Sequence, residues 1–248
     1  MSRIWQICAR ELRAYFLSPI GYVVITAFLF LNGIIFYLIL NAFSRPGAPP
    51  GSVMQIFLAR NVFYWFFFLL FISAITMRLF AEERRSGTLE ILMTAPVTDT
   101  EAVLGKYFGA FLFYLVLWAP TLAYVAILRR FSPIDMGPIA SGYLYLVLVG
   151  AMFLALGLLI SVLSRSQIVA AIVAFCVMFI VFLVPVFFGG LMSGGGWIRD
   201  AFSYMNLWDH AGDFSKGIVD SRPLIYYLSA TAILLFFSVQ ALAARKGR

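Results

Sequence analysis

Six long runs of apolar residues dominate the chain, and none of them contains an Asp, Glu, Lys, Arg or His. A helix needs about 20 largely apolar residues to cross the hydrocarbon core of a bilayer. We therefore predict six membrane-spanning helices, at 20–40, 61–77, 107–128, 139–163, 168–188 and 223–243. The runs are continuously apolar and lack the alternation of membrane-barrel strands. The sequence predicts an all-α integral membrane protein with a single transmembrane domain over 1–248.

The amino-acid composition supports this fold class. Of the 248 residues, 63% are apolar and 12% are charged, whereas a soluble domain has roughly 45–50% apolar and ~25% charged residues. A soluble globular enzyme and a disordered chain are both excluded. The two cysteines, Cys8 and Cys176, lie in unrelated contexts, and no Cys/His cluster has metal-ligand spacing. We therefore expect no metal site and no bound cofactor.

The basic residues indicate how the spans are oriented. Of the 18 Lys and Arg residues, eleven fall on the side that holds both termini, the 78–106 loop and the 164–167 turn, and seven on the other. Loops on the cytoplasmic side of a membrane protein carry an excess of Lys and Arg. We therefore expect both termini to lie in the cytoplasm.

The chain lacks the usual residues for an energy source of its own. Ion-coupled carriers place an ionisable group at membrane depth, and the six predicted spans contain none. The Gly105–Lys106 pair is followed by Tyr107, and Thr100 stands where a P-loop would have its first glycine. We predict that the chain is not an enzyme and has no nucleotide site, so that any energy for transport comes from another subunit.

Residues 1–19 are too polar to cross the membrane and are predicted to form an amphipathic elbow helix. Apolar residues recur every three or four positions on one face, and the opposite face carries Arg3, Arg10 and Arg13. Such a helix lies in the interface plane, where its arginines contact anionic lipid. Pro19 is expected to end it. The helix could serve as a membrane anchor alone or could also touch a cytoplasmic partner.

The loop at 78–106 concentrates charge, with five acidic and four basic residues. Ser86 is a plausible helix N-cap, apolar residues follow at helical spacing, and Pro96 ends the pattern. Thr98 and Glu101 have the spacing of a capping box at the start of the third span. The loop is either a solvated connector with self-paired charges or a short helix that docks into a groove on a cytosolic protein.

The longest outer loop, 189–222, contains two stretches with apolar residues at helical spacing. We predict two short re-entrant or interfacial helices there. Trp197 and Trp208 are suited to anchor them at the membrane surface. The lone histidine, His210, is expected to be a hydrogen-bonded structural residue, because no second metal ligand is near it in the sequence.

An aromatic run at 63–71 lies within the second predicted span. Such a run could line an apolar substrate path or face the lipid. We favour lipid contact.

The charged loop carries the pattern of a known family. The residues Phe80-x-Glu82-Glu83-x-x-x-Gly87-Thr88-Leu89-Glu90-x-Leu92-x-Thr94-x-Pro96-Val97 resemble the signature of type-2 ABC transporter permeases. The residues before span one, from Glu11 to Pro19, and those around His210 agree with it. Within the family, the chain is most similar to permeases associated with bacterial gliding motility, the GldF-like branch.

This resemblance implies the permease subunit of an ATP-driven exporter in the bacterial inner membrane. The subunit would pair with a second permease half and with two copies of a cytosolic ABC ATPase, which bind the ATP and magnesium. An auxiliary membrane or periplasmic subunit is possible, and no nucleic acid is expected. Residues 82–94 would form the coupling helix seated in the ATPase. Its implied contact residues are Glu82, Glu83, Gly87, Thr88 and Glu90.

The same resemblance implies that the outer helices close the outer end of the transport pathway, with Trp197, Trp208 and His210 as the outer gate. Two other functions stay open at this point. One is a membrane subunit that transmits ATP energy to periplasmic machinery without transporting a substrate. The other is an ion-coupled secondary carrier, against which the uncharged spans argue.

Overall fold

The structure is a computed structural model that describes residues 3–44, 53–59, 62–85, 97–131, 134–191 and 196–246. Every element in this part of the chain is helical. In chain order the elements are α1 (Arg3–Leu17), α2 (Pro19–Phe43), α3 (Val53–Ala59), α4 (Val62–Thr76), α5 (Ala81–Arg85), α7 (Asp99–Trp118), the 3-10 turn η1 (Ala119–Thr121), α8 (Leu122–Phe131), α9 (Met136–Leu163), α10 (Gln167–Leu191), α11 (Trp197–Tyr204), α12 (Leu207–Ser215) and α13 (Ser221–Lys246).

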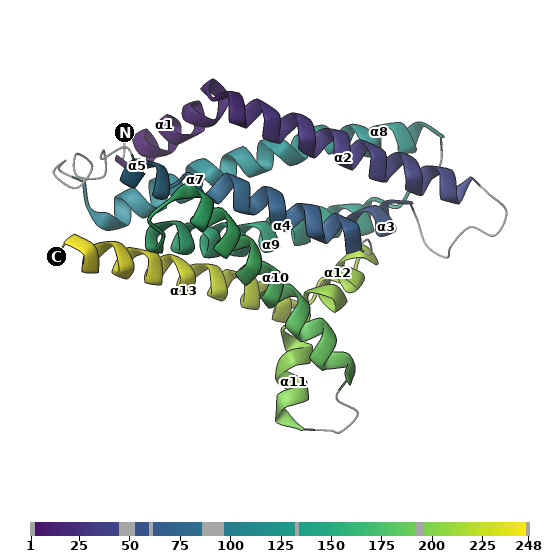
Figure 1. Ribbon diagram of the computed structural model, residues 1–248. Helices are drawn as coiled ribbons and strands as arrows, with labels where there is room; N and C mark the ends of the chain where they lie inside the picture. Colours follow the sequence, from purple (N-terminus) through teal and green to yellow (C-terminus); the bar gives the residue numbers. More distant parts are fainter. Residues whose placement is uncertain are drawn as a thin grey trace.

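Five helical stretches are long and apolar enough to cross a membrane. They are Pro19–Phe43, Asp99–Phe131, Met136–Leu163, Gln167–Phe188 and Ser221–Ala244. The long helices run side by side along the molecule, and both chain ends lie at the end occupied by α1 and α5 (Figure 1). The prediction of an all-α membrane protein is confirmed.

The second predicted span, at 61–77, is shorter than expected. Its helix α4 has 15 residues, which at 1.5 Å per residue extends roughly 22 Å, less than the ~30 Å hydrocarbon core. The short helix α3 precedes it, in the segment between the first two predicted spans. Met54, Phe57 and Leu58 of α3 are buried, so packing stabilises a helix too short to form by itself.

The predicted elbow helix is present as α1, and it ends where expected. Ser18 has an extended backbone, with φ −89° and ψ 134°, because the proline that follows disfavours the helical conformation. Ile7 and Cys8 of α1 are buried. The helix packs closely on α7, since a side chain at Gly105 would lie 2.7 Å from Ile7 Cβ.

Two local features of the sequence shape the helix α7. At its start, the Glu101 N–H donates to Thr98 Oγ1 at 3.2 Å, and the Thr98 N–H donates to Glu101 Oε2 at 2.9 Å. The predicted capping box is therefore confirmed. At its end, Pro120 lies in the turn η1, which separates α7 from α8. Removal of one backbone donor by the proline explains this interruption.

The core is centred on α9, whose small residues let other helices approach. A side chain at Gly150 would meet the Tyr114 ring, and one at Gly157 would lie 2.7 Å from Thr76 Cβ. In α4, Trp65 and Phe68 are buried in the same core. Our expectation that the aromatic run faces lipid is therefore wrong for these residues, because α4 packs against both α9 and α10.

The end of the molecule opposite the chain termini holds the two short helices expected in the outer loop, α11 and α12 (Figure 1). Asn206 caps α12, because its side chain accepts a hydrogen bond from the Trp208 N–H at 3.1 Å. Leu207, Ala211 and Phe214 of α12 are buried. This packing fixes α12 against the bundle.

Replacement of Gly157 by alanine should destabilise the bundle. The new methyl group would overlap the fully buried Thr76, and such overpacking costs roughly 1–3 kcal/mol. Gly212→Ala on α12 is the matched control, because nothing lies within 4 Å of the added carbon, and alanine favours the helix by roughly 0.5–1 kcal/mol. Thermal unfolding in detergent should give a lower Tm for Gly157→Ala only. Equal Tm values would contradict the close contact.

Candidate functional site

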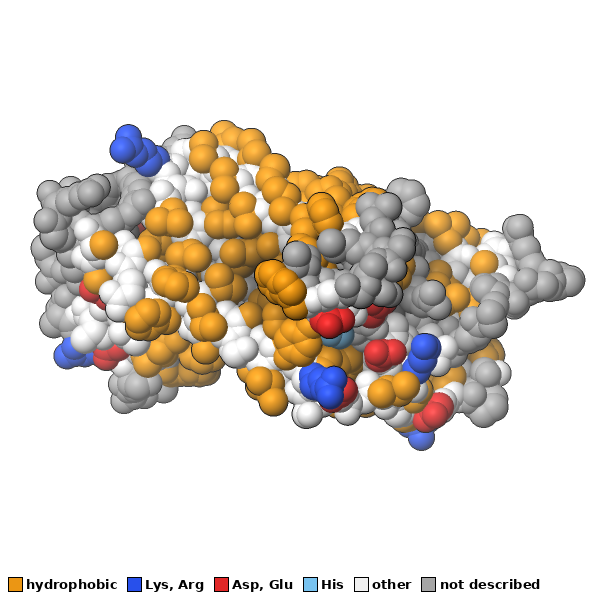
Figure 2. All heavy atoms as spheres, turned by 90° about the horizontal axis from the view of Figure 1, so that it is seen from below, with side chains coloured by type: hydrophobic (Ala, Val, Ile, Leu, Met, Phe, Trp, Pro, Cys, Tyr) orange, Lys and Arg blue, Asp and Glu red, His pale blue; other side chains and the backbone are white. Residues whose placement is uncertain are grey.

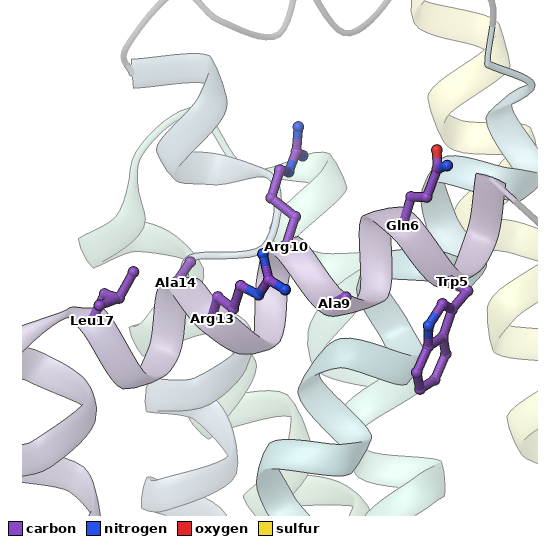
Figure 3. Close-up of a pocket in the computed structure, with 7 residues that line it drawn as sticks. All are labelled: Trp5, Gln6, Ala9, Arg10, Arg13, Ala14 and Leu17. Carbon is purple, nitrogen blue, oxygen red and sulfur yellow. The ribbon is translucent and has the colours of Figure 1, made fainter. Parts of the chain in front are cut away.

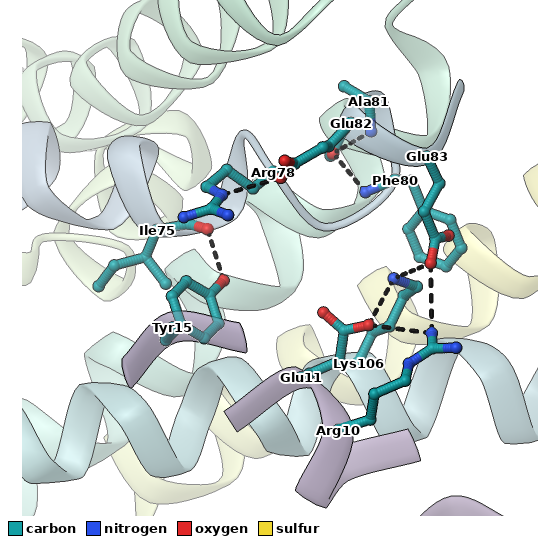
Figure 4. A network of polar contacts seen from close by, with 11 residues as sticks. Arg10, Glu11, Tyr15, Ile75, Arg78, Phe80, Ala81, Glu82, Glu83 and Lys106 are labelled. Carbon is teal, nitrogen blue, oxygen red and sulfur yellow. Dashed lines mark hydrogen bonds and ion pairs between the residues drawn. The ribbon is translucent and has the colours of Figure 1, made fainter. Parts of the chain in front are cut away.

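Three segments that are distant in the sequence meet at the end of the molecule that holds both termini. They are α1, the turn after α4 together with α5, and the start of α7. Charged side chains from all three converge there, as Figure 4 shows. We call this group the charged junction, and it consists of Arg10, Glu11, Glu83 and Lys106.

Lys106 is the centre of the charged junction. Its Nζ lies 2.9 Å from Glu11 Oε1 and 2.9 Å from Glu83 Oε1, and its side chain is only 2% exposed. Arg10 Nη2 adds a second cation, 3.3 Å from Glu83 Oε1 and 3.2 Å from Glu11 Oε1. Two carboxylates thus face two cations, and this arrangement balances the charge of a desolvated ammonium group.

An aromatic ring completes the surroundings of Lys106. Its Nζ lies 5.1 Å from the ring centroid of Phe80, a distance at which the negative face of the ring attracts a cation. Phe80 is itself buried. The turn before α5 therefore holds Lys106 through Phe80, and α5 itself holds it through Glu83.

A second set of contacts joins the end of α4 to the bend between α1 and α2. Arg78 Nε donates to Glu82 Oε2 at 2.9 Å, and Arg78 Nη1 donates to Ser18 Oγ at 2.9 Å. The Tyr15 hydroxyl donates to the Ile75 carbonyl at 2.7 Å. These hydrogen bonds hold the end of α1 against the end of α4, beside the charged junction (Figure 4).

The hydroxyl of Ser161 on α9 connects the same turn to the bundle core. Its Oγ accepts from the N–H groups of Phe80 at 3.1 Å and Ala81 at 3.2 Å. N–H groups at the start of a helix have no partner within that helix. Ser161 satisfies them and thereby fixes the start of α5 on α9.

The face of α1 that points away from the bundle forms a shallow groove of about 640 Å³. Figure 3 shows Trp5, Arg10, Arg13 and Leu17 along it. Trp5 and Leu17 are 50% and 83% exposed. The groove therefore combines exposed apolar groups with arginines, as an interfacial helix does.

At the opposite end, the predicted outer residues lie in different surroundings. The His210 ring is buried, and its Nδ1 is 2.9 Å from the Tyr227 hydroxyl. The Trp208 ring lies 6.4 Å from the ring of Phe182 on α10. Trp197 is 79% exposed on α11. The structure thus brings Trp208 and His210 together on α12 and leaves Trp197 apart from them.

Comparison with known proteins identifies the family. Residues 47–208 match the family described as "ABC-2 family transporter protein". The chain belongs to this family. The match covers the helices from α3 to α11 and the start of α12, including Glu83 and Lys106 of the charged junction. A search of curated proteins found no match. The protein is therefore a multi-pass permease of an ABC-2 transporter, and its family implies an ABC ATPase as partner.

The predicted coupling residues of this ABC-2 permease divide into two groups. Glu82 and Glu83 are described by the structure, and Gly87, Thr88 and Glu90 lie outside the described residues. Within its own chain, Glu83 pairs with Lys106 and Arg10, because burial of the lysine requires a carboxylate beside it. The contact of Glu82 and Glu83 with an ATPase stays a prediction.

The three arginines predicted to lie at the membrane interface have different surroundings in the structure. Arg3 and Arg13 are exposed, in keeping with a surface position. The position of Arg10 as an interfacial anchor stays a prediction, and within the chain Arg10 pairs with Glu11 and Glu83. The physical reason is that α5 brings a carboxylate over the polar face of α1.

Sequence reasoning missed Glu11, Ser161 and Lys106. A signal for Glu11 was present, because it lies three residues after Cys8 and four before Tyr15, on the buried face of an amphipathic helix. A carboxylate on such a face needs a cation from another element. No local pattern indicated that this cation is Lys106.

Replacement of Lys106 by methionine should destabilise the ABC-2 permease by roughly 3–5 kcal/mol, because Glu11 and Glu83 would lose the ammonium group between them. Lys216→Met is the matched control, since Lys216 is an exposed residue that directly follows α12. Thermal unfolding of both variants checks this. The double variant with Glu83→Gln should recover part of the loss. A Tm of Lys106→Met equal to that of the control would refute the junction.

Acidification should destabilise the end of the molecule that holds α12, through His210. Burial lowers the pKa of this histidine, and Asp209, Asp213 and Asp220 oppose the shift. Below the ordinary histidine pKa of about 6.5, the unfolded chain binds a proton more readily than the folded chain does. The stability of the fold therefore decreases as the pH is lowered. The Tm should drop more between pH 7.5 and 5.0 for the wild type than for His210→Gln. Parallel curves would contradict the shift.

Proposed function

We propose that the chain is the permease subunit of an ATP-driven exporter. It couples ATP hydrolysis by a separate cytosolic ATPase to substrate movement across the bacterial inner membrane. The observation that carries this proposal is the charged junction, which joins the segment expected to meet the ATPase to α1 and α7. Two copies of the ATPase, which bind ATP and magnesium, and a second permease half complete the transporter.

The charged junction supports a specific route for the coupling. Residues 82–94 seat on the ATPase, and a displacement of this segment acts first on α5. From α5, the displacement is transmitted through Glu83 to Lys106 on α7 and to Arg10 on α1. It is also transmitted through Ser161 to α9. Packed helices move as units because their interfaces resist gradual deformation. The half-transporter therefore alternates between two arrangements as the ATPase closes and opens.

The helix α1 has a second role in this proposal. With both termini in the cytoplasm, its exposed face lies in the interface plane, where Arg3 and Arg13 attract anionic headgroups. The exposed Trp5 and Leu17 enter the apolar boundary. The membrane then supports α1 from one side while Arg10 and Glu11 hold it to α5 and α7.

The outer helices close the pathway at the opposite end. Trp208 contacts Phe182 of α10, and His210 contacts Tyr227 of α13. The helix α12 is thus in contact with two membrane-length helices, and a change in their relative position alters the outer closure. Trp197 on α11 anchors the exposed end at the membrane surface.

Replacement of Glu83 by glutamine should uncouple the ATPase, because the neutral amide no longer binds Lys106 and Arg10 as a charged partner. We expect the stimulated ATP hydrolysis of the complex to fall by at least about fivefold. The measurement is ATPase activity of the complex purified in mild detergent, together with the amount of permease in the membrane.

Glu101→Gln is the matched control, because glutamine also completes a capping box, and its activity should equal that of the wild type. Gly87→Pro, in the implied contact segment, should reduce the activity as well. Wild-type activity in both Glu83→Gln and Gly87→Pro would overturn the coupling route. Failure of any ATPase to copurify with the wild-type permease would overturn the proposed function.

A further inference from the structure

Three polar side chains from three different helices are buried in the bundle with polar atoms left unpaired. They are Asn32 of α2, Tyr64 of α4 and Trp118 of α7, which are 4%, 3% and 5% exposed. Within the described part of the chain, no hydrogen-bond partner of good geometry meets Asn32 Oδ1, the Tyr64 hydroxyl or Trp118 Nε1. We call these three residues the polar cluster. Buried polar atoms in proteins are nearly always hydrogen-bonded, so each of these atoms calls for a partner.

Ring contacts show that the polar cluster surrounds one place. Asn32 lies one helical turn after Phe28 and one turn before Phe36, on the same face of α2. A continuous series of ring contacts joins these two phenylalanines: Phe28 to Trp118 at 5.1 Å, Trp118 to Tyr64 at 5.9 Å, Tyr64 to Phe57 at 6.4 Å, and Phe57 to Phe36 at 5.8 Å. The series closes on both sides of Asn32. The three polar groups therefore share one aromatic enclosure between α2, α3, α4 and α7.

Polar groups next to the polar cluster do find partners inside the protein. The Tyr114 hydroxyl, one turn before Trp118, donates to the Leu146 carbonyl at 2.8 Å. The Thr121 hydroxyl donates to the Trp118 carbonyl at 2.7 Å. Packing in this region thus satisfies other buried hydroxyl groups, and the polar cluster is an exception to it.

The surroundings favour a neutral ligand. Figure 2 shows a broad band of hydrophobic side chains on one face of the bundle, with charged side chains to either side of it. Asn32 lies near the middle of α2, and neither α2 nor α4 contains an Asp, Glu, Lys, Arg or His, whereas the charged residues of α7 all precede Tyr107. A charged group at the polar cluster would be desolvated without a counter-ion, which is strongly unfavourable.

The pattern of donors and acceptors selects the chemical group. Asn32 Nδ2 donates to the Phe28 carbonyl at 2.8 Å, so Oδ1 is left as an acceptor. The indole Nε1 of Trp118 can only donate, and the Tyr64 hydroxyl can do either. A ligand group must therefore donate to one member of the polar cluster and accept from another. A hydroxyl is the smallest neutral group that does both.

We propose that the polar cluster binds a neutral hydroxyl group, which donates to Asn32 Oδ1 and accepts from Trp118 Nε1, with the Tyr64 hydroxyl as a third partner. The hydroxyl belongs to a water molecule or to an uncharged amphiphile such as a long-chain alcohol, whose apolar part packs on the aromatic rings. The site uses none of the residues of the charged junction. It is tested on the permease alone, so the result does not depend on an ATPase.

Two labelling experiments on the purified full-length chain in detergent distinguish the sources of the hydroxyl. Radiolysis in ¹⁸O-labelled water adds ¹⁸O to aromatic side chains beside a bound water, and mass spectrometry should find it on Tyr64 and Trp118 if the ligand is water. A photoreactive octanol with a diazirine beside its hydroxyl should label the same residues if the ligand is an amphiphile. The same diazirine chain without the hydroxyl is the control probe and should label them less.

Two variants test the assigned groups. Asn32→Leu removes the acceptor at nearly constant size, and Tyr64→Phe removes only the hydroxyl, so it keeps the test valid if Asn32→Leu does not fold. Each should reduce the labelling of Trp118 by about fivefold, the effect of one lost hydrogen bond. Tyr37→Phe is the matched control, because Tyr37 is 64% exposed on the same helix as Asn32, and its labelling should equal that of the wild type.

Labelling of the polar cluster in either experiment, reduced by the variants, supports the proposal and names the source of the hydroxyl. The proposal is overturned if neither experiment labels Tyr64 or Trp118. It is equally overturned if the labelling is the same in Asn32→Leu, Tyr64→Phe and Tyr37→Phe.

Discussion

The buried ammonium group of Lys106 is the constraint on which the charged end of this protein depends. An ammonium ion in a largely desolvated place is tolerated only when carboxylates balance it at hydrogen-bonding distance. Glu11 and Glu83 meet that requirement at 2.9 Å each. Because the two carboxylates come from α1 and α5 and the lysine from α7, one electrostatic requirement places three separate segments against one another.

Tight helix packing extends this local constraint through the membrane domain. Ser161 on α9 holds the start of α5, and Gly157, one turn earlier in α9, admits Thr76 of α4 into close contact. Gly150 admits Tyr114 of α7 further along the same helix. Contacts of this kind transmit a displacement as a shift of whole helices. They link the charged junction to the end where α12 contacts α10 and α13.

Local features of the fold could be predicted from the sequence because their causes are local. The break at Pro19, the capping box of Thr98 and Glu101, and the cap at Asn206 all arise from residues within a few positions of one another. The helix α3 could not be predicted in this way, because seven residues form a stable helix only when tertiary packing buries them. The aromatic run in α4 was misjudged, since an apolar side chain suits lipid and protein core equally well.

The sequence by itself determined that this is a helical membrane protein, where most helices begin and end, and that its charge concentrates outside the spans. It belongs to the ABC-2 transporter family, and the family pattern is likewise a property of the sequence. Only the tertiary structure decided which charges meet. Glu83 could have faced a partner protein or solvent, and it pairs with Lys106, 23 positions along the chain. Electrostatic pairing follows distance in space and burial, and neither is encoded in local spacing.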